Sequence, residues 1–334
     1  PLIGLAAELT IESSRPARAD VTARSEGHTV ELPRTAALST RHTIPVVGMR
    51  ADLDYEITVE LYDEDGGLLG EAASIDFTTG ALPGWFPDHQ LMIEPERSSP
   101  GYPIVEAAPN QPSDDAPDEV SSIYDDAPDE VLIAYDDAGE IVWYYFNSGS
   151  NGGVEQTDTG TFLMHYWPFG IREVDPLGEL VGHWRPELNS VDPDQVDFWN
   201  DALAGNPGDI DPLQVVPDWI ELSGFHHENW PMPNGNILTL STTLHDLTDE
   251  QQRTFCPDDP ASFIVISDVA VEFEPDGTVL RTWDLWDAID INEHPGSWLC
   301  IDAGLFQDEQ TRDWTHANSV IYDEQRDAIV VSSR

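Results

Sequence analysis

Lysine is absent from this chain: all 14 basic residues are Arg, against 64 acidic residues, for a formal net charge of −50. In molar salt the Debye length falls to about 3 Å, so the self-repulsion of such a chain is screened. We therefore predict a halophilic protein with a surface rich in Asp and Glu. A disordered acidic chain is the alternative, but 11 Trp, 11 Phe and 40% hydrophobic residues supply material for a packed core.

Positive charge is too scarce for a basic stripe, which argues against nucleic acid and against an anionic membrane surface as partners. No run of about 18 apolar residues occurs, so the sequence predicts no membrane span. The chain begins with Pro-Leu rather than Met. A leader or anchor that was removed, or simply not included, would explain this. We expect an exported protein, extracellular or at the cell surface, in a high-salt environment.

Cysteine is nearly absent, and neither a Cys-x-x-Cys motif nor a Cys/His metal spacing occurs. Cys256 and Cys300 could form one disulfide or remain two buried thiols. Export favours the disulfide, because oxidising compartments preserve such bonds.

Residues 1–80 consist of short segments of alternating polar and apolar residues, separated by turn signals about every ten residues. This pattern predicts a small β-sandwich of the Ig/fibronectin-III type. Residues 81–129 are interpreted as a proline-punctuated linker followed by an acidic low-complexity insertion. That insertion contains a tandem duplication of Asp-Asp-Ala-Pro-Asp-Glu-Val at 114–120 and 125–131.

Two repeated units occupy residues 130–334. The first, Asp/Glu-x-x-Gly before an apolar pair and an aromatic residue, begins at 136, 175 and 274; the second places a turn before an apolar strand, at 159–164, 234–240 and 326–332. Two hairpins of this kind would form one four-stranded blade, so we predict an all-β protein whose second domain is a partial β-propeller. A second β-sandwich is the alternative. About three blades and part of a fourth fit before Arg334, and the sequence looks cut short there.

Candidate functional residues occur in two segments, 224–238 and 313–334. Aligned as repeats, they superimpose His227 and Asn229 on His316 and Asn318. Residues two apart on a strand share a face, so each pair should project into the central channel, where Arg334 could join them. Arg and His side chains that converge on a channel form an anion site, because a guanidinium offers a planar fork of donors and an imidazole can give a proton to a leaving oxygen.

Structural roles are the alternative for most histidines. His226 should point away from His227 on a regular strand, which favours packing or support for the site. A metal site is disfavoured because His227 and His316 lack evident carboxylate or Cys partners. Glu228 could be catalytic, but an outward-facing carboxylate is the simpler interpretation. Structural roles are also expected for His165, His183, His245 and His294.

At these residues the chain resembles the bacterial and archaeal arylsulfotransferases that work without the nucleotide sulfate donor. The similar segments are Asp-Trp-x-His-x-Asn-Ser from 313, Ser-Ser-Arg at 332–334, Phe-His-His-Glu at 225–228 and Pro-Asn-Gly-Asn-Ile-Leu at 233–238. Leu-Ala-Ala at 5–7 and residues 44–55 resemble the N-terminal sandwich domain of that family. The resemblance covers nearly the whole chain apart from the acidic insertions.

The resemblance implies a six-bladed propeller, about half of it in this chain, that moves a sulfuryl group from a phenolic sulfate ester to a phenol. It implies a ping-pong route through a sulfated histidine, with no cofactor, and with His227, His316 and Arg334 as catalytic residues. Asn318 and His226 are expected to bind substrate. The family's nucleophilic histidine is expected beyond Arg334, so the chain would be a fragment or a truncated relative. A surface-displayed propeller for binding or assembly is the alternative function, and a homo-oligomer is left open.

Overall fold

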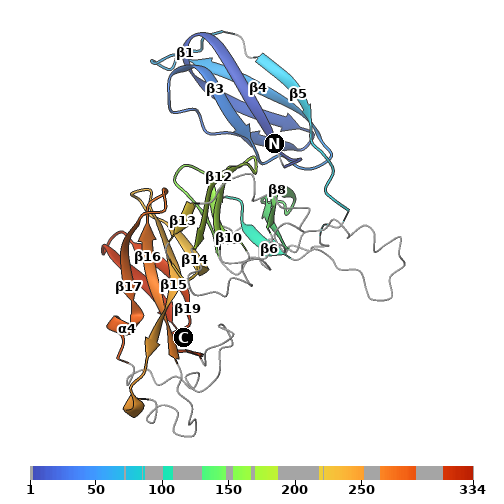
Figure 1. The fold of residues 1–334 in the computed structure, drawn as a ribbon. Coiled ribbons are helices and arrows are strands. Elements are labelled where there is room, and N and C mark those ends of the chain that lie inside the picture. Colours follow the sequence, from blue (N-terminus) through green and yellow to red (C-terminus); the bar gives the residue numbers. More distant parts are fainter. Residues whose placement is uncertain are drawn as a thin grey trace, which may run out of the picture. The chain divides into compact units, whose positions relative to one another are not determined.

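The computed structural model describes residues 3–70, 73–84, 86, 101–107, 130–147, 153–166, 170–186, 218–220, 222–251, 264–290 and 311–333. Nearly every regular element in these ranges is a β-strand (Figure 1), so the all-β prediction is confirmed. The chain forms two compact units, one of residues 1–148 with 175–179 and the other of residues 149–174 with 180–334.

The N-terminal strands form a sandwich because β1 (Ala7–Ser25) is long enough to serve two sheets. Its first part pairs with β3 (Ser39–Val46), and its second part pairs with β2 (His28–Glu31) and β4 (Asp54–Tyr62). Strand β5 (Ala73–Thr78) completes the second sheet on the far side of β4. Every second side chain of the later part of β1 is buried, which is the alternation that the sequence showed: Ala17, Ala19, Val21 and Ala23.

A buried ion pair lies inside the first unit. Arg50, which follows the strand β3, donates from Nε and from a terminal nitrogen to Oδ2 of Asp136, at 2.7 and 2.6 Å. The Asp136 side chain is 3% exposed. The same carboxylate accepts two backbone N–H groups of its own turn through Oδ1, so its charge is both paired and hydrogen-bonded.

The remaining strands form separate antiparallel sheets. The first contains β6 (Ile104–Ala107), β7 (Glu130–Tyr135) and β8 (Ile141–Asn147). Strand β6 lies within the segment that the sequence assigned to linker and insertion, and residues 108–129 lie outside the described ranges.

Two larger sheets and one hairpin follow. Both larger sheets are antiparallel meanders of four strands with one short strand added in parallel. The first contains β9 (Val154–Gln156), β10 (Phe162–Tyr166), β11 (Gly170–Val174) and β12 (Leu180–Pro186), and β13 (Asp218–Ile220) pairs in parallel with β12. The second contains β14 (His226–Pro231), β15 (Ile237–Asp246), β16 (Ile264–Phe273) and β17 (Val279–Asp284), and β18 (Thr311–Asp313) pairs in parallel with β16. A helical turn, α4 (Leu285–Ala288), follows β17. Strands β19 (Ala317–Asp323) and β20 (Ala328–Ser333) form the last hairpin. Four-stranded meanders in succession are consistent with propeller blades.

The repeated Gly has a clear structural cause. Among the described residues from 130 onward, five hairpins share one turn, in which the fourth residue is a Gly with φ between 84° and 86°: Gly139, Gly160, Gly178, Gly235 and Gly277. The N–H of each Gly donates to the carbonyl of the first turn residue at 2.8–3.0 Å. Residues with a Cβ are strained at this φ, which explains the Asp-x-x-Gly pattern.

The repeated Trp links one repeat to the next. Trp143 Nε1 donates to the carbonyl of Pro176 at 2.9 Å, and Trp184 Nε1 donates to that of Pro275 at 2.9 Å. In each case the acceptor is the second residue of the next repeat's turn. Both indoles are buried, at 4% and 2% exposure, so the hydrogen bond satisfies a polar group that water does not reach.

Candidate active site

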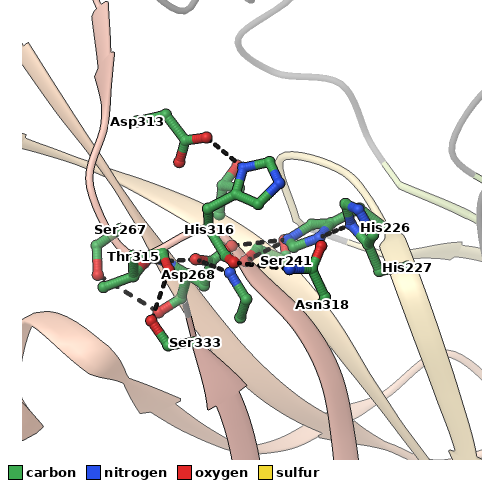
Figure 2. Close-up of polar contacts among 12 residues, drawn as sticks. His226, His227, Ser241, Ser267, Asp268, Asp313, Thr315, His316, Asn318 and Ser333 are labelled. Carbon is green, nitrogen blue, oxygen red and sulfur yellow. Dashed lines mark hydrogen bonds and ion pairs between the residues drawn. The ribbon is translucent and has the colours of Figure 1, made fainter. Parts of the chain in front are cut away.

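The candidate site is built on β14, which carries His226 and His227, and on the turn before its neighbouring strand β19, which carries His316. The imidazoles of His226, His227 and His316 lie close together (Figure 2). The ring of His227 meets that of His226 edge-on at 5.2 Å between centroids and that of His316 at 5.6 Å. The sequence prediction that His227 and His316 converge therefore agrees with the geometry.

Both of these histidines have an unusual backbone. His227 has φ of 61° and His316 has φ of 39°, in the left-handed region that residues with a Cβ rarely occupy. A break in strand register accompanies each, between His226 and Asn229 and between Ala317 and Ser319. Backbone strain of this kind persists only where the surrounding structure enforces it, and it is concentrated at functional sites.

The bulge in β14 overturns the expectation that His227 shares a face with Asn229. Asn229 is fully buried, and its amide donates to the carbonyls of Gly153 and Leu163 at 3.3 and 3.4 Å. Asn318 is exposed, and its amide donates to the carbonyl of His316 at 3.3 Å. The period of two that governs side-chain direction holds only on an unbroken strand.

His226 does not point away from His227, contrary to the sequence argument. The two Nδ1 atoms are 3.0 Å apart. On the other side of the His226 ring, Nε2 lies 3.1 Å from Oδ1 of Asp268 and 3.2 Å from the carbonyl of Ser241. The same register break rotates His226 toward its neighbour, so this residue lies between a buried carboxylate and His227.

Asp268 is a buried carboxylate on β16, and its two oxygens have different partners. Oδ1 contacts His226, whereas Oδ2 accepts the hydroxyl of Thr315 and the backbone N–H of Ala317, the latter at 2.7 Å. Burial alone would raise the pKa of Asp268, but the hydrogen bonds from His226, Thr315 and Ala317 lower it. Asp268 is therefore an ionised anchor between β14 and the start of β19.

His316 also has a carboxylate partner, because its Nδ1 contacts Oδ2 of Asp313 three residues earlier. The expectation that His227 and His316 lack carboxylate partners was therefore wrong for His316. The turn between β18 and β19 brings the two side chains together. Within the described residues, no three His, Cys, Asp or Glu side chains are grouped so as to hold a metal ion.

The local environment favours neutral imidazoles in the interior of the site. Burial, followed by the neighbouring His226 and His316, lowers the pKa of His227. Burial also lowers the pKa of His165, to about 4. A neutral imidazole at His227 can accept a proton, which is the state that a general base requires.

Glu228 is not the outward-facing carboxylate that the sequence suggested. Its Oε1 is buried and has no hydrogen-bond partner in the described part of the chain. Burial, with a contribution from the charge of Glu155 on β9, raises the pKa of Glu228 to about 7. Two carboxyl groups that share a poorly solvated space do not both ionise readily.

The other predicted residues either have structural contacts or lie outside the described ranges. His165 and His183 are buried, and His245 stacks on Trp286 at 4.4 Å and contacts Asp284, as expected of structural histidines. His294, Arg334, Cys256 and Cys300 lie outside the described residues. The strand that leads to Arg334 is described as far as Ser333, which pairs with Ala317 and donates to the carbonyl of Thr315 at 2.5 Å.

The sequence argument overlooked Asp268 and Asp313. A signal existed for Asp268, since it interrupts the long apolar run of β16, where an unpaired carboxylate would be costly. For Asp313 the motif was noted, but its side chain received no role.

Family comparisons agree with this arrangement. Residues 110–334 match the family model described as arylsulfotransferase (ASST), and residues 1–79 match the arylsulfotransferase Ig-like domain. Comparison with curated proteins found no match. The first model spans the three site histidines, and the second spans the N-terminal sandwich. The chain therefore belongs to the arylsulfotransferase family, with an Ig-like domain ahead of its catalytic region.

Proposed function

We propose that this protein is an aryl-sulfate sulfotransferase that moves a sulfuryl group from a phenolic sulfate ester to a phenol. The observation that carries the proposal is the convergence of His226, His227 and His316, two of them backed by carboxylates, in a chain of net charge −50. Nitrogen donors gathered in this way suit a tetrahedral anionic group. Family membership supports sulfotransfer over the alternative of a binding propeller.

In the proposed chemistry, the bond between sulfur and the donor phenol oxygen breaks and the phenolate leaves with the electron pair. His316 donates to the sulfuryl oxygens and supplies the proton that the leaving phenolate takes up, and His227 is placed to take the proton of the acceptor phenol. The sulfuryl group passes to a histidine nitrogen and then to the oxygen of the acceptor phenol, whose proton returns to the site. This ping-pong route splits one displacement into two, and Arg334 and Asn318 are proposed to add donors to the sulfuryl oxygens.

We further propose that the protein works outside the cell or at its surface, in high salt. None of the helices in the described ranges is long and apolar enough to cross a membrane. The composition supports the salt requirement, because 64 acidic side chains and no Lys suit a medium that screens charge.

The test is turnover of para-nitrophenyl sulfate with phenol as acceptor, in concentrated salt. We expect His316→Ala to lower kcat/KM by about 100-fold or more, because a donor to the transition state is lost. His245→Ala is the matched control, since His245 also contacts a carboxylate but lies outside the site. Equal activity of His316→Ala and the unaltered protein would contradict the site. A folded protein without turnover would favour the binding propeller.

A further inference from the structure

The hydrogen bonds around His226 determine where its protons lie. A carboxylate and a backbone carbonyl can only accept, and both Asp268 and Ser241 face Nε2 of His226. Nε2 must therefore carry a hydrogen. In a neutral His226 the other nitrogen, Nδ1, then has only a lone pair and acts as an acceptor.

This assignment propagates to His227. The two Nδ1 atoms are 3.0 Å apart, so one of them must donate to the other. Because Nδ1 of the neutral His226 is an acceptor, Nδ1 of His227 is the donor. The remaining nitrogen of His227, Nε2, is then left with a free lone pair. A buried aspartate thus selects the tautomer of a histidine that it does not touch.

We propose that Asp268, His226 and His227 form a proton relay in which Asp268 and His226 are positioning residues for His227. In the acceptor half-reaction, the phenol gives its proton to Nε2 of His227, while the Nδ1 hydrogen of His227 moves to Nδ1 of His226. One proton enters and one is passed on, so the positive charge resides on His226, where the carboxylate of Asp268 stabilises it. In the donor half-reaction His316 gives the leaving phenolate its proton, and exchange with water returns the relay and His316 to their starting protonation before the next turnover. This inference rests on the proposed sulfotransferase function and replaces a substrate-binding role for His226.

The surroundings of the relay support its direction. The pKa of His227 is lowered by burial and by the neighbouring imidazoles of His226 and His316, which disfavours a lasting charge there. His165, also buried, adds a further imidazole near the pair. The buried carboxylate of Asp268 contacts His226 directly, whereas Asp313 contacts His316. A proton passed along the relay therefore arrives beside the carboxylate of Asp268, which attracts it.

Asp268→Asn is a sharp test, because the two carboxylate oxygens have different partners. Oδ2 accepts from Thr315 and Ala317, so the amide oxygen of the variant is held at that position. The amide NH₂ group then faces Nε2 of His226 as a donor. This reverses the polarity of the relay and leaves Nε2 of His227 protonated and unable to accept a proton.

The matched control is Asp284→Asn. Asp284 contacts Nε2 of His245 at 3.1 Å, the same distance as in the relay pair and in the same sheet, but away from the site. We expect Asp268→Asn to lower kcat by about 1000-fold with little change in KM, as expected when the tautomer of a catalytic histidine is wrong. Asp284→Asn should leave kcat within about twofold of the unaltered protein. Similar kcat values for the two variants would overturn the relay.

Nitrogen NMR of the histidine-labelled protein decides the question without turnover. The expected result for the unaltered protein is hydrogen on Nδ1 of His227 and on Nε2 of His226; a hydrogen on Nε2 of His227 would overturn the proposal. If Asp268→Asn fails to fold, His226→Gln replaces it, since Gln can still donate to Asp268 but has no atom in the place of Nδ1. Loss of activity in His226→Gln is expected, and full activity would overturn the relay. If no aryl sulfate is turned over at all, the proposed function fails while the NMR result still tests the tautomers.

Discussion

At the scale of single residues, the site depends on buried side chains whose charge is decided by their neighbours. Asp268 stays ionised because three donors surround it, whereas Glu228 has a second carboxylate nearby and its Oε1 has no donor among the described residues. The two residues are similar in chemistry and opposite in the direction of their pKa shifts. Partner geometry, rather than residue type, decides which of them carries charge at neutral pH.

Glu228 should make the stability of the protein depend on pH. Its pKa is raised from about 4.5 to about 7, so between these pH values the native state holds more protons than the unfolded state. The free energy of unfolding therefore falls as pH rises through this window. We expect Glu228→Gln to stabilise the protein at pH 8 by about 1–2 kcal/mol, a figure reduced for partial solvent contact.

The measurement is thermal unfolding at constant molar salt across this pH range. Glu179→Gln is the control, because Glu179 is exposed on a turn and should leave the pH profile unchanged. A Glu228→Gln profile that retains the full slope of the unaltered protein between these pH values would assign the slope to other groups.

At the scale of elements, the repeats are held by turns and by the tryptophans that reach the following repeat. The Gly of each turn fixes the hairpin, and the Trp of one repeat donates to the carbonyl of the next repeat's turn. Trp184 also folds back over Gly182, where a Cβ would lie 2.2 Å from the indole ring. Residue 182 is a Gly because the Trp occupies the space of a side chain.

We expect Trp184→Phe to destabilise the protein by about 2–3 kcal/mol, because it removes the hydrogen bond from the buried indole to the carbonyl of Pro275 and also removes buried ring volume. Trp283 stands at the equivalent place of the later repeat and is 36% exposed, so Trp283→Phe is the control and should cost less than about 1 kcal/mol. Unfolding in guanidinium chloride measures both. Equal losses would show that the hydrogen bond adds no stability beyond ring packing.

At the scale of the whole molecule, charge dominates. A formal charge of −50 on 334 residues produces strong self-repulsion at low ionic strength, which disfavours the compact state. Local ion pairs such as Arg50 with Asp136 offset only a small part of it, since 14 Arg face 64 acidic residues. The stability of the folded state is therefore expected to depend on the salt concentration as well as on the packing of the hydrophobic core.

We expect the melting temperature to fall by more than about 10 °C when sodium chloride is lowered from about 3 M to about 0.1 M, where the Debye length grows to about 10 Å. Tryptophan fluorescence follows the transition. Potassium chloride should act like sodium chloride, because screening depends on ionic strength rather than on the cation. A melting temperature that is independent of salt would contradict the predicted adaptation to high salt.

The sequence by itself determined the all-β class, the sandwich and the hairpin repeats, because period-two burial and Gly turns act between neighbours in the chain. It also indicated His227 and His316, since the repeat aligned them.

Only the tertiary structure decided where these side chains point. The bulge in β14, with its positive φ at His227, separates this residue from the buried Asn229 and leaves His226 in contact with His227. Asp268 reaches His226 from a different strand, 42 positions away in the printed numbering, and this pairing depends on the register of β14, β15 and β16. Strand register is a property of the folded sheet, so the relay could not be read from the sequence.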